Sequence, residues 1–257
     1  MTSVWNPSQY EKFRDERSAP FYDLLSLVRP VPGGRIVDLG CGTGALTREL
    51  HRNVQAAETV GIDSSETMLA KAEEFAGDGL RFAQGEITAF APTEPVDVLF
   101  SNAALQWIDD HEPLFTHLTE TIAAGGQLAV QVPANADHPS HVVARAVAQE
   151  EPFATAMDGY LRSWPVREPE WYAALLDRLG YAEQSVRLQV YGHHLDSREG
   201  VVEWVRGTYL TDYQKRMPPE LFEQYLARYR EVLLPQLDGG RPFFYPFKRI
   251  LIWGRRP

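Results

Sequence analysis

The fold is decided by Val37-Asp-Leu-Gly-Cys-Gly-Thr-Gly-Ala45, in which an apolar run leads directly into three alternating glycines. The apolar run at 35–39 has the length and composition of a buried strand, and residues 45–52 follow a helical pattern. Because glycine has no Cβ atom, the turn between them can be tight and a ligand can approach its backbone closely. The N–H groups at the start of the following helix favour a carboxylate or another anionic group. The segment therefore predicts a strand–turn–helix unit that holds a ligand.

The same alternation of strand and helix continues along the next ninety residues. Apolar runs indicate further strands, and helical patterns lie before and between them; the strands are expected at 59–63, 80–84, 96–101 and 127–132, and the helices at 18–29, 65–76 and 110–123. Ser18 is the expected cap of the helix at 18–29, which should end before Pro30. Strands that are apolar throughout indicate a parallel sheet covered by helices on both faces. The pattern predicts the α/β class.

After Pro133 the alternation stops. Strands are expected at 186–191 and 249–253, separated by helical patterns at 197–209 and 219–234. We therefore expect residues 1–195 together with 247–257 to form the core, and residues 196–246 to form a helical cap insert that holds the substrate. The aromatic run at 243–247 either closes a lid over the active site or joins the insert to the last strand, and we favour the lid.

An acidic residue at the end of the next predicted strand is the second feature that indicates a ligand site. Asp63 ends the next predicted strand about twenty residues later, where a carboxylate can accept hydrogen bonds from both hydroxyls of a ribose. A glycine turn followed by an acidic strand end is a nucleoside-binding pair. A nicotinamide-dependent dehydrogenase also uses this pair, but with the spacing G-x-G-x-x-G. The spacing G-x-G-x-G found here disfavours that alternative.

Composition and charge limit the partners. The net charge of −10 is unfavourable for general binding to nucleic acid. The sequence contains no run of about 18 apolar residues, so no membrane span is expected. The single cysteine and an N-terminus without the features of a secretory signal favour the cytoplasm. From residue 196 to the end, 11 Lys and Arg stand against 8 Asp and Glu, which suits a small anionic substrate. The sequence leaves the oligomeric state open, with a monomer favoured.

The glycine turn resembles that of the class I methyltransferases, whose motif commonly reads Asp-Leu-Gly-Cys-Gly-Thr-Gly, as residues 38–44 do here. Residues 61–65, 84–87 and 101–107 extend the resemblance. It implies a Rossmann-like, doubly wound sheet of seven mostly parallel strands, the last one antiparallel, and S-adenosyl-L-methionine as cofactor.

The resemblance also implies which residues contact the cofactor. Asp38, Gly40 and Gly42 would surround its methionine part, and Asp63 would bind the ribose. The remaining contacts would come from residues near the adenosine (Ser64, Met68), beside the adenine (Glu86, Ile87) and at the sulfonium (Asn102, Ala103, Trp107), together with Tyr10, Arg17 and Cys41.

Nearly the whole chain is similar to the trans-aconitate 2-methyltransferases. The similarity is carried by Val4-Trp-Asn-Pro-Ser-Gln-Tyr10 and by the segments 101–107, 128–133 and 246–249. It implies transfer of a methyl group to one carboxylate of trans-aconitate, giving the monomethyl ester and S-adenosylhomocysteine. The alternatives are another small acid, malonyl-carrier protein as in related methyltransferases, and a protein that binds the cofactor without catalysis.

The implied chemistry determines which residue types to look for. A carboxylate is already ionised near neutral pH, so it needs no general base, and we expect no catalytic side chain. Arginine is favoured for neutralising the other carboxylates of the substrate. The substrate-binding residues that we expect are Trp5, Tyr209, Arg241, Tyr245 and Arg249, chosen from a wider set that includes Arg17, His138, His141, Lys215 and Arg216. His138 and His141 have metal-ligand spacing, but a site needs three or four ligands, so no metal is expected.

Overall fold

The computed structural model describes residues 14–257, and the side chains from residue 18 onwards. It divides into two compact units. The sheet unit contains Arg17–Ala134, Pro165–Gln189 and Arg249–Pro257, and the helical unit contains Asn135–Trp164 and Val190–Lys248. Each unit is described by itself below.

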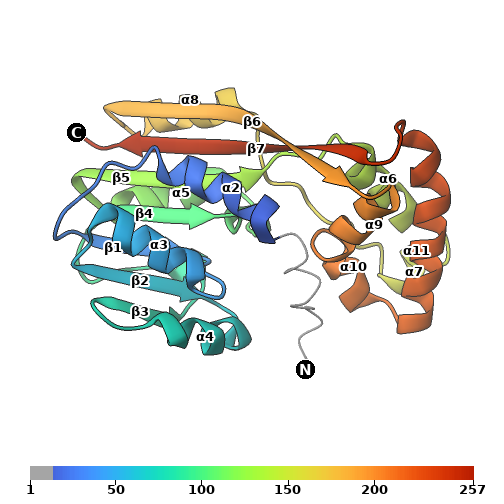
Figure 1. The fold of residues 1–257 in the computed structure, drawn as a ribbon, viewed down its shortest axis with the longest axis horizontal. Helices are drawn as coiled ribbons and strands as arrows, with labels where there is room; N and C mark the ends of the chain where they lie inside the picture. Colours follow the sequence, from blue (N-terminus) through green and yellow to red (C-terminus); the bar gives the residue numbers. More distant parts are fainter. Residues whose placement is uncertain (1–13) are drawn as a thin grey trace. The chain divides into compact units, whose positions relative to one another are not determined.

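One seven-stranded sheet runs through the sheet unit, and residues 190–195 and 243–248 of its last two strands belong to the helical unit. Its strands, in the order β3-β2-β1-β4-β5-β7-β6 (Figure 1), are β3 (Leu80–Gln84), β2 (Glu58–Asp63), β1 (Arg35–Leu39), β4 (Val96–Asn102), β5 (Ile122–Pro133), β7 (Phe243–Arg255) and β6 (Glu183–Leu195). β1 to β5 pair in parallel, and β7 pairs with β5 in the antiparallel direction. The expected sheet of seven mostly parallel strands with an antiparallel last strand is confirmed.

Helices in the sheet unit connect these strands. They are α2 (Arg14–Leu25), α3 (Ala45–Val54), α4 (Glu66–Ala72), α5 (His111–Glu120) and α8 (Pro169–Arg178), with short 3₁₀ turns at Glu73–Phe75, Ile87–Ala89 and Leu105–Trp107. Within residues 14–257 no helix is both long enough and apolar enough to cross a membrane.

The first described helix differs from the expected helix at 18–29. α2 begins at Arg14 and ends at Leu25, so Ser18 lies inside the helix instead of capping it. The helix ends early because the chain tightens into three-residue turns: the N–H groups of Leu27 and Val28 donate to Leu24 and Leu25. The Ser26 hydroxyl also donates to the carbonyl of Asp23 at 2.7 Å, satisfying one of the last carbonyls of the helix.

An apolar layer covers one face of the sheet. Phe100 on β4, Ala129 on β5 and Trp253 on β7 are neighbours in register and belong to one buried cluster with Phe21 and Leu24 of α2. Side chains along a strand alternate between faces, so residues two positions further along point the same way. The next members of this row are Asn102, Gln131 and Leu251. The apolar face therefore becomes polar at the carboxyl ends of β4 and β5.

The helical unit has an aromatic core. Its helices are α6 (Pro139–Ala148), α7 (Phe153–Ala156), α9 (Glu199–Arg206), α10 (Thr211–Arg216) and α11 (Pro219–Leu233), followed by a 3₁₀ turn at Leu234–Gln236. The expected insert covered only 196–246, whereas the structure groups 135–164 and 190–195 with it. The reason is packing of α6 on α11, where the Tyr225 and Tyr229 hydroxyls donate to the carbonyls of Ala144 and Ser140. Residues far apart in sequence thus share one core.

The expected lid at 243–247 is part of a strand. β7 begins at Phe243, and its side chains alternate: Phe243, Tyr245 and Phe247 are buried, whereas Phe244 is 53% exposed. Burial of alternate aromatic rings against the helical core extends the strand, so these residues connect the unit to the last strand and the lid prediction is wrong. β5 and β6 are likewise longer than the runs that predicted them.

Candidate cofactor site

The glycine turn leaves one open position. The backbone φ angles of Gly40, Gly42 and Gly44 are +79°, +56° and +76°. A Cβ atom on Gly40 would lie 2.2 Å from the Cβ of Ala104, and one on Gly44 would lie 2.6 Å from the Phe82 ring, so close packing requires both glycines. At Gly42 no atom of the described chain comes within 4 Å of that position. The protein therefore leaves space for a ligand directly against the Gly42 backbone.

Asp63 connects the turn to the next helix. Its Oδ2 accepts a hydrogen bond of 2.9 Å from the Gly42 N–H, and its Oδ1 accepts one of 2.9 Å from the Ser65 N–H. Ser65 in turn caps α4, where its side chain accepts from the Met68 N–H. Each carboxylate oxygen has a second acceptor site. Asp63 is thus held at the end of β2 with capacity left for the two hydroxyls of a ribose.

Asp38 is a buried acid beneath the turn. It is 4% exposed, and its Oδ2 accepts a hydrogen bond of 2.7 Å from the Thr47 hydroxyl of α3. Burial raises the pKa of the Asp38 carboxyl to about 7, an effect that the Thr47 hydrogen bond opposes and the nearby Asp63 charge reinforces. A carboxylate that is costly to ionise alone becomes favourable beside a cation. The site therefore suits a ligand carrying an ammonium group.

The end of β4 and the segment after it add polar atoms on the same side of the sheet, where the parallel strands have their carboxyl ends. Ala103 has φ +56° and donates from its N–H to the Gln131 carbonyl, and Ala104 is the residue packed against Gly40. The Oδ1 of Asn102 and the Oε1 of Gln106 are buried and find no hydrogen-bond partner among the described residues. Native proteins rarely leave buried acceptors unmet, so these oxygens indicate a place where a ligand donates.

The structure brings most of the other expected cofactor residues to this edge. Ile87 lies within 3.8 Å of the Gly40 Cβ position, and Met68 is half-buried in the first turn of α4. Ser64, Glu86 and Trp107 are exposed. Tyr10 lies outside the described residues, and Arg17 is described only as backbone in α2.

Cys41 has a packing role in the turn. It is buried, and burial raises the pKa of its thiol well above the usual range, so the nucleophilic thiolate is suppressed. Thr47 is a residue that the sequence reasoning missed. Its position nine residues after Asp38, in the first turn of the helix, was an available signal for its hydrogen bond to that acid.

Arg249 lies in the sheet unit near the same end of the strands. It is buried, opposite Pro133 of β5, and its Nη1 donates to the Gln131 Oε1 at 3.1 Å. It lies on the same face of the sheet as Asn102 and Gln131, since it stands two residues from Leu251, which is the register neighbour of Gln131.

The other expected substrate residues that the structure describes belong to the helical unit. Tyr209 is buried between the His141 ring and the Arg162 guanidinium, each 4.6 Å from its ring centroid, and Tyr245 is buried beside Asn135. Arg241 is exposed in the loop before β7. Trp5 lies outside the described residues.

The wider set of candidates separates by charge. Burial lowers the pKa of His138 to about 4 and that of His141 to about 3, so both rings are neutral at physiological pH and cannot neutralise a carboxylate. Lys215 and Arg216 are exposed on α10, with the Arg216 guanidinium over the Tyr160 ring. Among residues 18–257, no three His, Cys, Asp or Glu side chains are grouped so that they could hold a metal ion.

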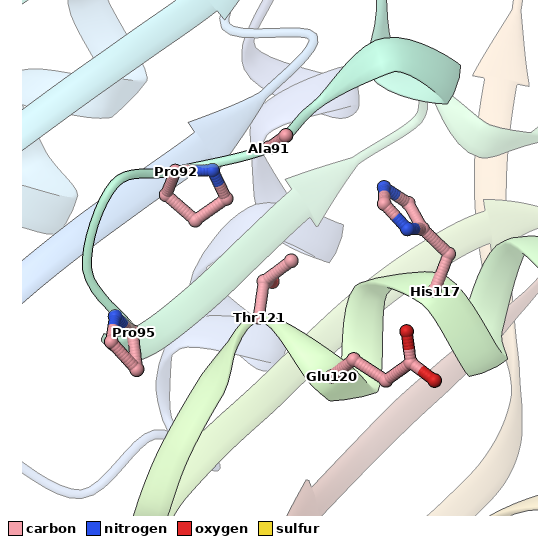
Figure 2. Close-up of a pocket in the computed structure, with 6 residues that line it drawn as sticks. All are labelled: Ala91, Pro92, Pro95, His117, Glu120 and Thr121. Carbon is pink, nitrogen blue, oxygen red and sulfur yellow. The ribbon is translucent and has the colours of Figure 1, made fainter.

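A surface pocket of about 190 Å³ lies elsewhere on the sheet unit (Figure 2). Its lining residues are Ala91, Pro92, Pro95, His117, Glu120 and Thr121. Pro95 immediately precedes β4 and Thr121 immediately precedes β5, so the pocket lies at the amino ends of these strands. The glycine turn follows the carboxyl end of β1, which is the opposite edge of the parallel sheet. This pocket is therefore separate from the candidate site.

Comparisons with known proteins agree with this site. Residues 36–126 match the family model described as a methyltransferase domain. A trans-aconitate 2-methyltransferase of Deinococcus radiodurans is 42% identical over 99% of both chains, and one of Methylobacterium nodulans is 38% identical over 98% of both. The chain belongs to the trans-aconitate 2-methyltransferase family. It is an S-adenosylmethionine-dependent methyltransferase.

Solved structures agree with the fold. The YcgJ protein of Bacillus subtilis covers 92% of this chain, and 97% of its own chain is matched, with a TM-score of 0.61 at 15% identity. An S-adenosylmethionine-dependent methyltransferase of Mesorhizobium loti covers 94% of this chain and is itself covered completely, with a TM-score of 0.52 at 23% identity. These similarities support the class I methyltransferase sheet.

The residues present fit the cofactor of this family. The open space at Gly42, the buried acid Asp38 and the unmet oxygens of Asn102 and Gln106 suit a nucleoside that carries an ammonium group. Asp63 stands where a ribose acid is expected. The exposed Glu86 and half-buried Ile87 stay predictions for the adenine.

Gly42→Ala should separate cofactor binding from stability. The added methyl group fills the ligand space without touching the described chain, so we expect S-adenosylhomocysteine affinity to fall at least about tenfold. The positive φ angle should cost about 1–2 kcal/mol of unfolding free energy. Gly33→Ala is the matched control, since Gly33 has φ +77° and open space outside the site. Calorimetric titration of both variants measures this, and equal affinities would contradict the assignment.

Asp38→Asn should alter the pH dependence of stability. Between pH 4 and 7 native Asp38 keeps a proton that the unfolded chain releases, so the free energy of unfolding falls as pH rises through that window. The decrease amounts to at most about 4 kcal/mol. Urea denaturation without cofactor measures the free energy of unfolding of both proteins at pH 5 and at pH 8.5. The difference, variant minus wild type, should be larger at pH 8.5 than at pH 5, because only the wild type loses stability as pH rises. A difference of the same size at both pH values would show that Asp38 does not titrate in this range.

Proposed function

We propose that this protein methylates a carboxylate of trans-aconitate, producing the monomethyl ester and S-adenosylhomocysteine. The observation that supports it most is the identity of 42% and 38% to enzymes of that name over nearly the entire chain. The single cysteine favours the cytoplasm, and the net charge of −10 disfavours a nucleic-acid partner.

The chemistry requires little from protein side chains. Bound S-adenosylmethionine supplies an electrophilic methyl group, and a carboxylate oxygen that accepts it has no proton to lose. The protein therefore has to orient the acid, exclude water and neutralise the carboxylates that do not react. Burial lowers the pKa of His138 to about 4 and that of His141 to about 3, so both imidazoles are weak bases, in keeping with a reaction that needs no general base.

Arg249 is the proposed anchor for one of the unreactive carboxylates. It is the buried guanidinium described above at the carboxyl end of the central strands, and a planar guanidinium pairs with a carboxylate through two parallel hydrogen bonds. Tyr209, Tyr245, Arg241 and Trp5 stay candidates for the remaining contacts with the substrate.

Malonyl-carrier protein is the alternative acceptor. An acidic carrier protein requires a basic docking surface with several Lys and Arg, and the excess of three positive charges after residue 195 is small for that purpose. The small acid is therefore the favoured substrate.

One incubation tests the proposed reaction. Wild-type protein is mixed with methyl-labelled S-adenosylmethionine and a panel of di- and tricarboxylic acids, and methyl esters are separated and counted. We expect the label on a carboxylate, with trans-aconitate methylated at the highest kcat/KM. Label on an amine or a ring carbon, or preferential methylation of malonyl-carrier protein, would contradict the proposal.

Arg249→Met should weaken substrate binding selectively. Loss of a buried charged partner should raise the KM for trans-aconitate by about 30-fold or more, since such contacts are worth several kcal/mol. The KM for S-adenosylmethionine should change little. Arg255→Met is the control, because Arg255 lies on the same strand but pairs with Glu183. If both variants show the same KM for trans-aconitate, Arg249 is not the anchor.

A further inference from the structure

We propose that Gln131 is the second half of the carboxylate clamp, and that its side-chain amide N–H donates to the same substrate carboxylate that Arg249 neutralises. This inference rests on the proposed function, because it assigns a partner to the proposed Arg249 anchor. No residue of β5 was among the expected site residues.

Gln131 occupies a fully buried position near the carboxyl end of β5, where the apolar face of the sheet becomes polar. It is 0% exposed, and it is the register neighbour of Asn102 on β4 and of Leu251 on β7. Its backbone carbonyl accepts from the N–H of Ala103, which joins β5 to the segment that packs on the glycine turn. The side chain therefore lies beside both Arg249 and the candidate cofactor site.

Arg249 determines the orientation of the amide. A guanidinium carries only donors, so the group that faces it must be the amide oxygen, and the Arg249 Nη1 does donate to the Oε1 of Gln131 at 3.1 Å. The Nε2 group must then point away from that contact. This Nε2 is buried, and no acceptor for it exists among the described residues. An unmet buried donor costs free energy, which indicates that a ligand supplies the acceptor.

A second buried glutamine on the same strand shows the contrasting case. The Oε1 of Gln127 accepts from the Arg29 N–H at 2.8 Å and from the Trp253 Nε1 at 3.0 Å, and its Nε2 donates to the Arg29 carbonyl at 2.9 Å. Every polar group of Gln127 is thus used by the protein. Because Gln127 lies four residues earlier on the same face, the open donor of Gln131 is not a general property of this strand.

The surroundings favour an anion as the missing acceptor. The neighbouring Arg249 guanidinium makes the potential positive at Gln131, and the guanidinium and the Gln131 Nε2 are both hydrogen-bond donors. The unmet atoms of Asn102, the last residue of β4, and of Gln106 are oxygens and require a donor instead. The carboxyl-end side of the sheet therefore offers donors from β5 and β7 for an acid, and acceptors from the end of β4 and the segment after it for a different group such as an ammonium.

The test compares Gln131→Met with the matched control Gln127→Met. Calorimetric titration with trans-aconitate in the presence of S-adenosylhomocysteine gives the Kd of the acid without relying on turnover. We expect Gln131→Met to raise this Kd by about 10- to 100-fold, because the lost hydrogen bond involves a charged acceptor. The Kd of S-adenosylhomocysteine should stay the same. Gln127→Met should lower the melting temperature and leave both Kd values unchanged.

An Arg249→Met background separates direct donation from a supporting role. If Gln131 served only to hold Arg249, adding Gln131→Met to Arg249→Met would cost nothing further. Direct donation predicts a further rise of about two- to tenfold in the Kd of trans-aconitate. Should Gln131→Met fail to fold, Gln131→Glu keeps the shape and the acceptor for Arg249 but removes the donor, and should bind trans-aconitate still more weakly.

The outcomes distinguish this inference from the proposed function. A wild-type protein that neither binds nor methylates trans-aconitate would overturn both. A wild-type protein that does so, with a Gln131→Met Kd within twofold of its own, would overturn the inference alone. An equal loss of affinity for trans-aconitate and for S-adenosylhomocysteine would also overturn it, since a general distortion of the site would then be the cause.

Discussion

The cofactor site depends on the carboxylate of Asp63. It accepts from the Gly42 N–H on one side and from the Ser65 N–H on the other, so it joins the turn after β1 to the first turn of α4. These two segments follow the neighbouring parallel strands β1 and β2. The bridge places the Asp63 carboxyl group directly beside the open position at Gly42. The same group thus holds the glycine turn and is positioned to bind a sugar.

Around this bridge the polar groups separate by the charge that they favour. Asp38 is a carboxyl whose pKa is raised by burial, and the nearby Asn102 and Gln106 present oxygens, all of which favour a positively charged or donating group. Arg249 and Gln131 present donors, which favour an anion. A methyltransferase for an acid requires both environments close together, because a cationic sulfonium and a carboxylate must meet. Grouping the acceptors apart from the donors would let the carboxyl-end side of one sheet bind two oppositely charged ligands.

Much of the fold could be predicted from local pattern. The strands β1 to β4 are short runs rich in apolar residues, so periodicity located them to within a few residues, whereas β5 begins five residues earlier than expected. Predictions were wrong where distant residues decide the outcome. The run at 243–247 is a strand because alternate rings pack into the helical core, and α6 joins that core through Tyr225 and Tyr229. Neither contact leaves a signal in the local sequence.

The sequence by itself determined the glycine turn, the acid at Asp63 and the family of the chain, because backbone freedom and residue order are local properties that survive without a structure. Only the tertiary structure decided the raised pKa of Asp38 and the orientation of the Gln131 amide. Both depend on burial and on partners from other strands and helices: Thr47 for the first, and Arg249, 118 residues further along the chain, for the second. The free energy of a polar group depends on which atoms surround it, and the chain acquires those neighbours only when it folds.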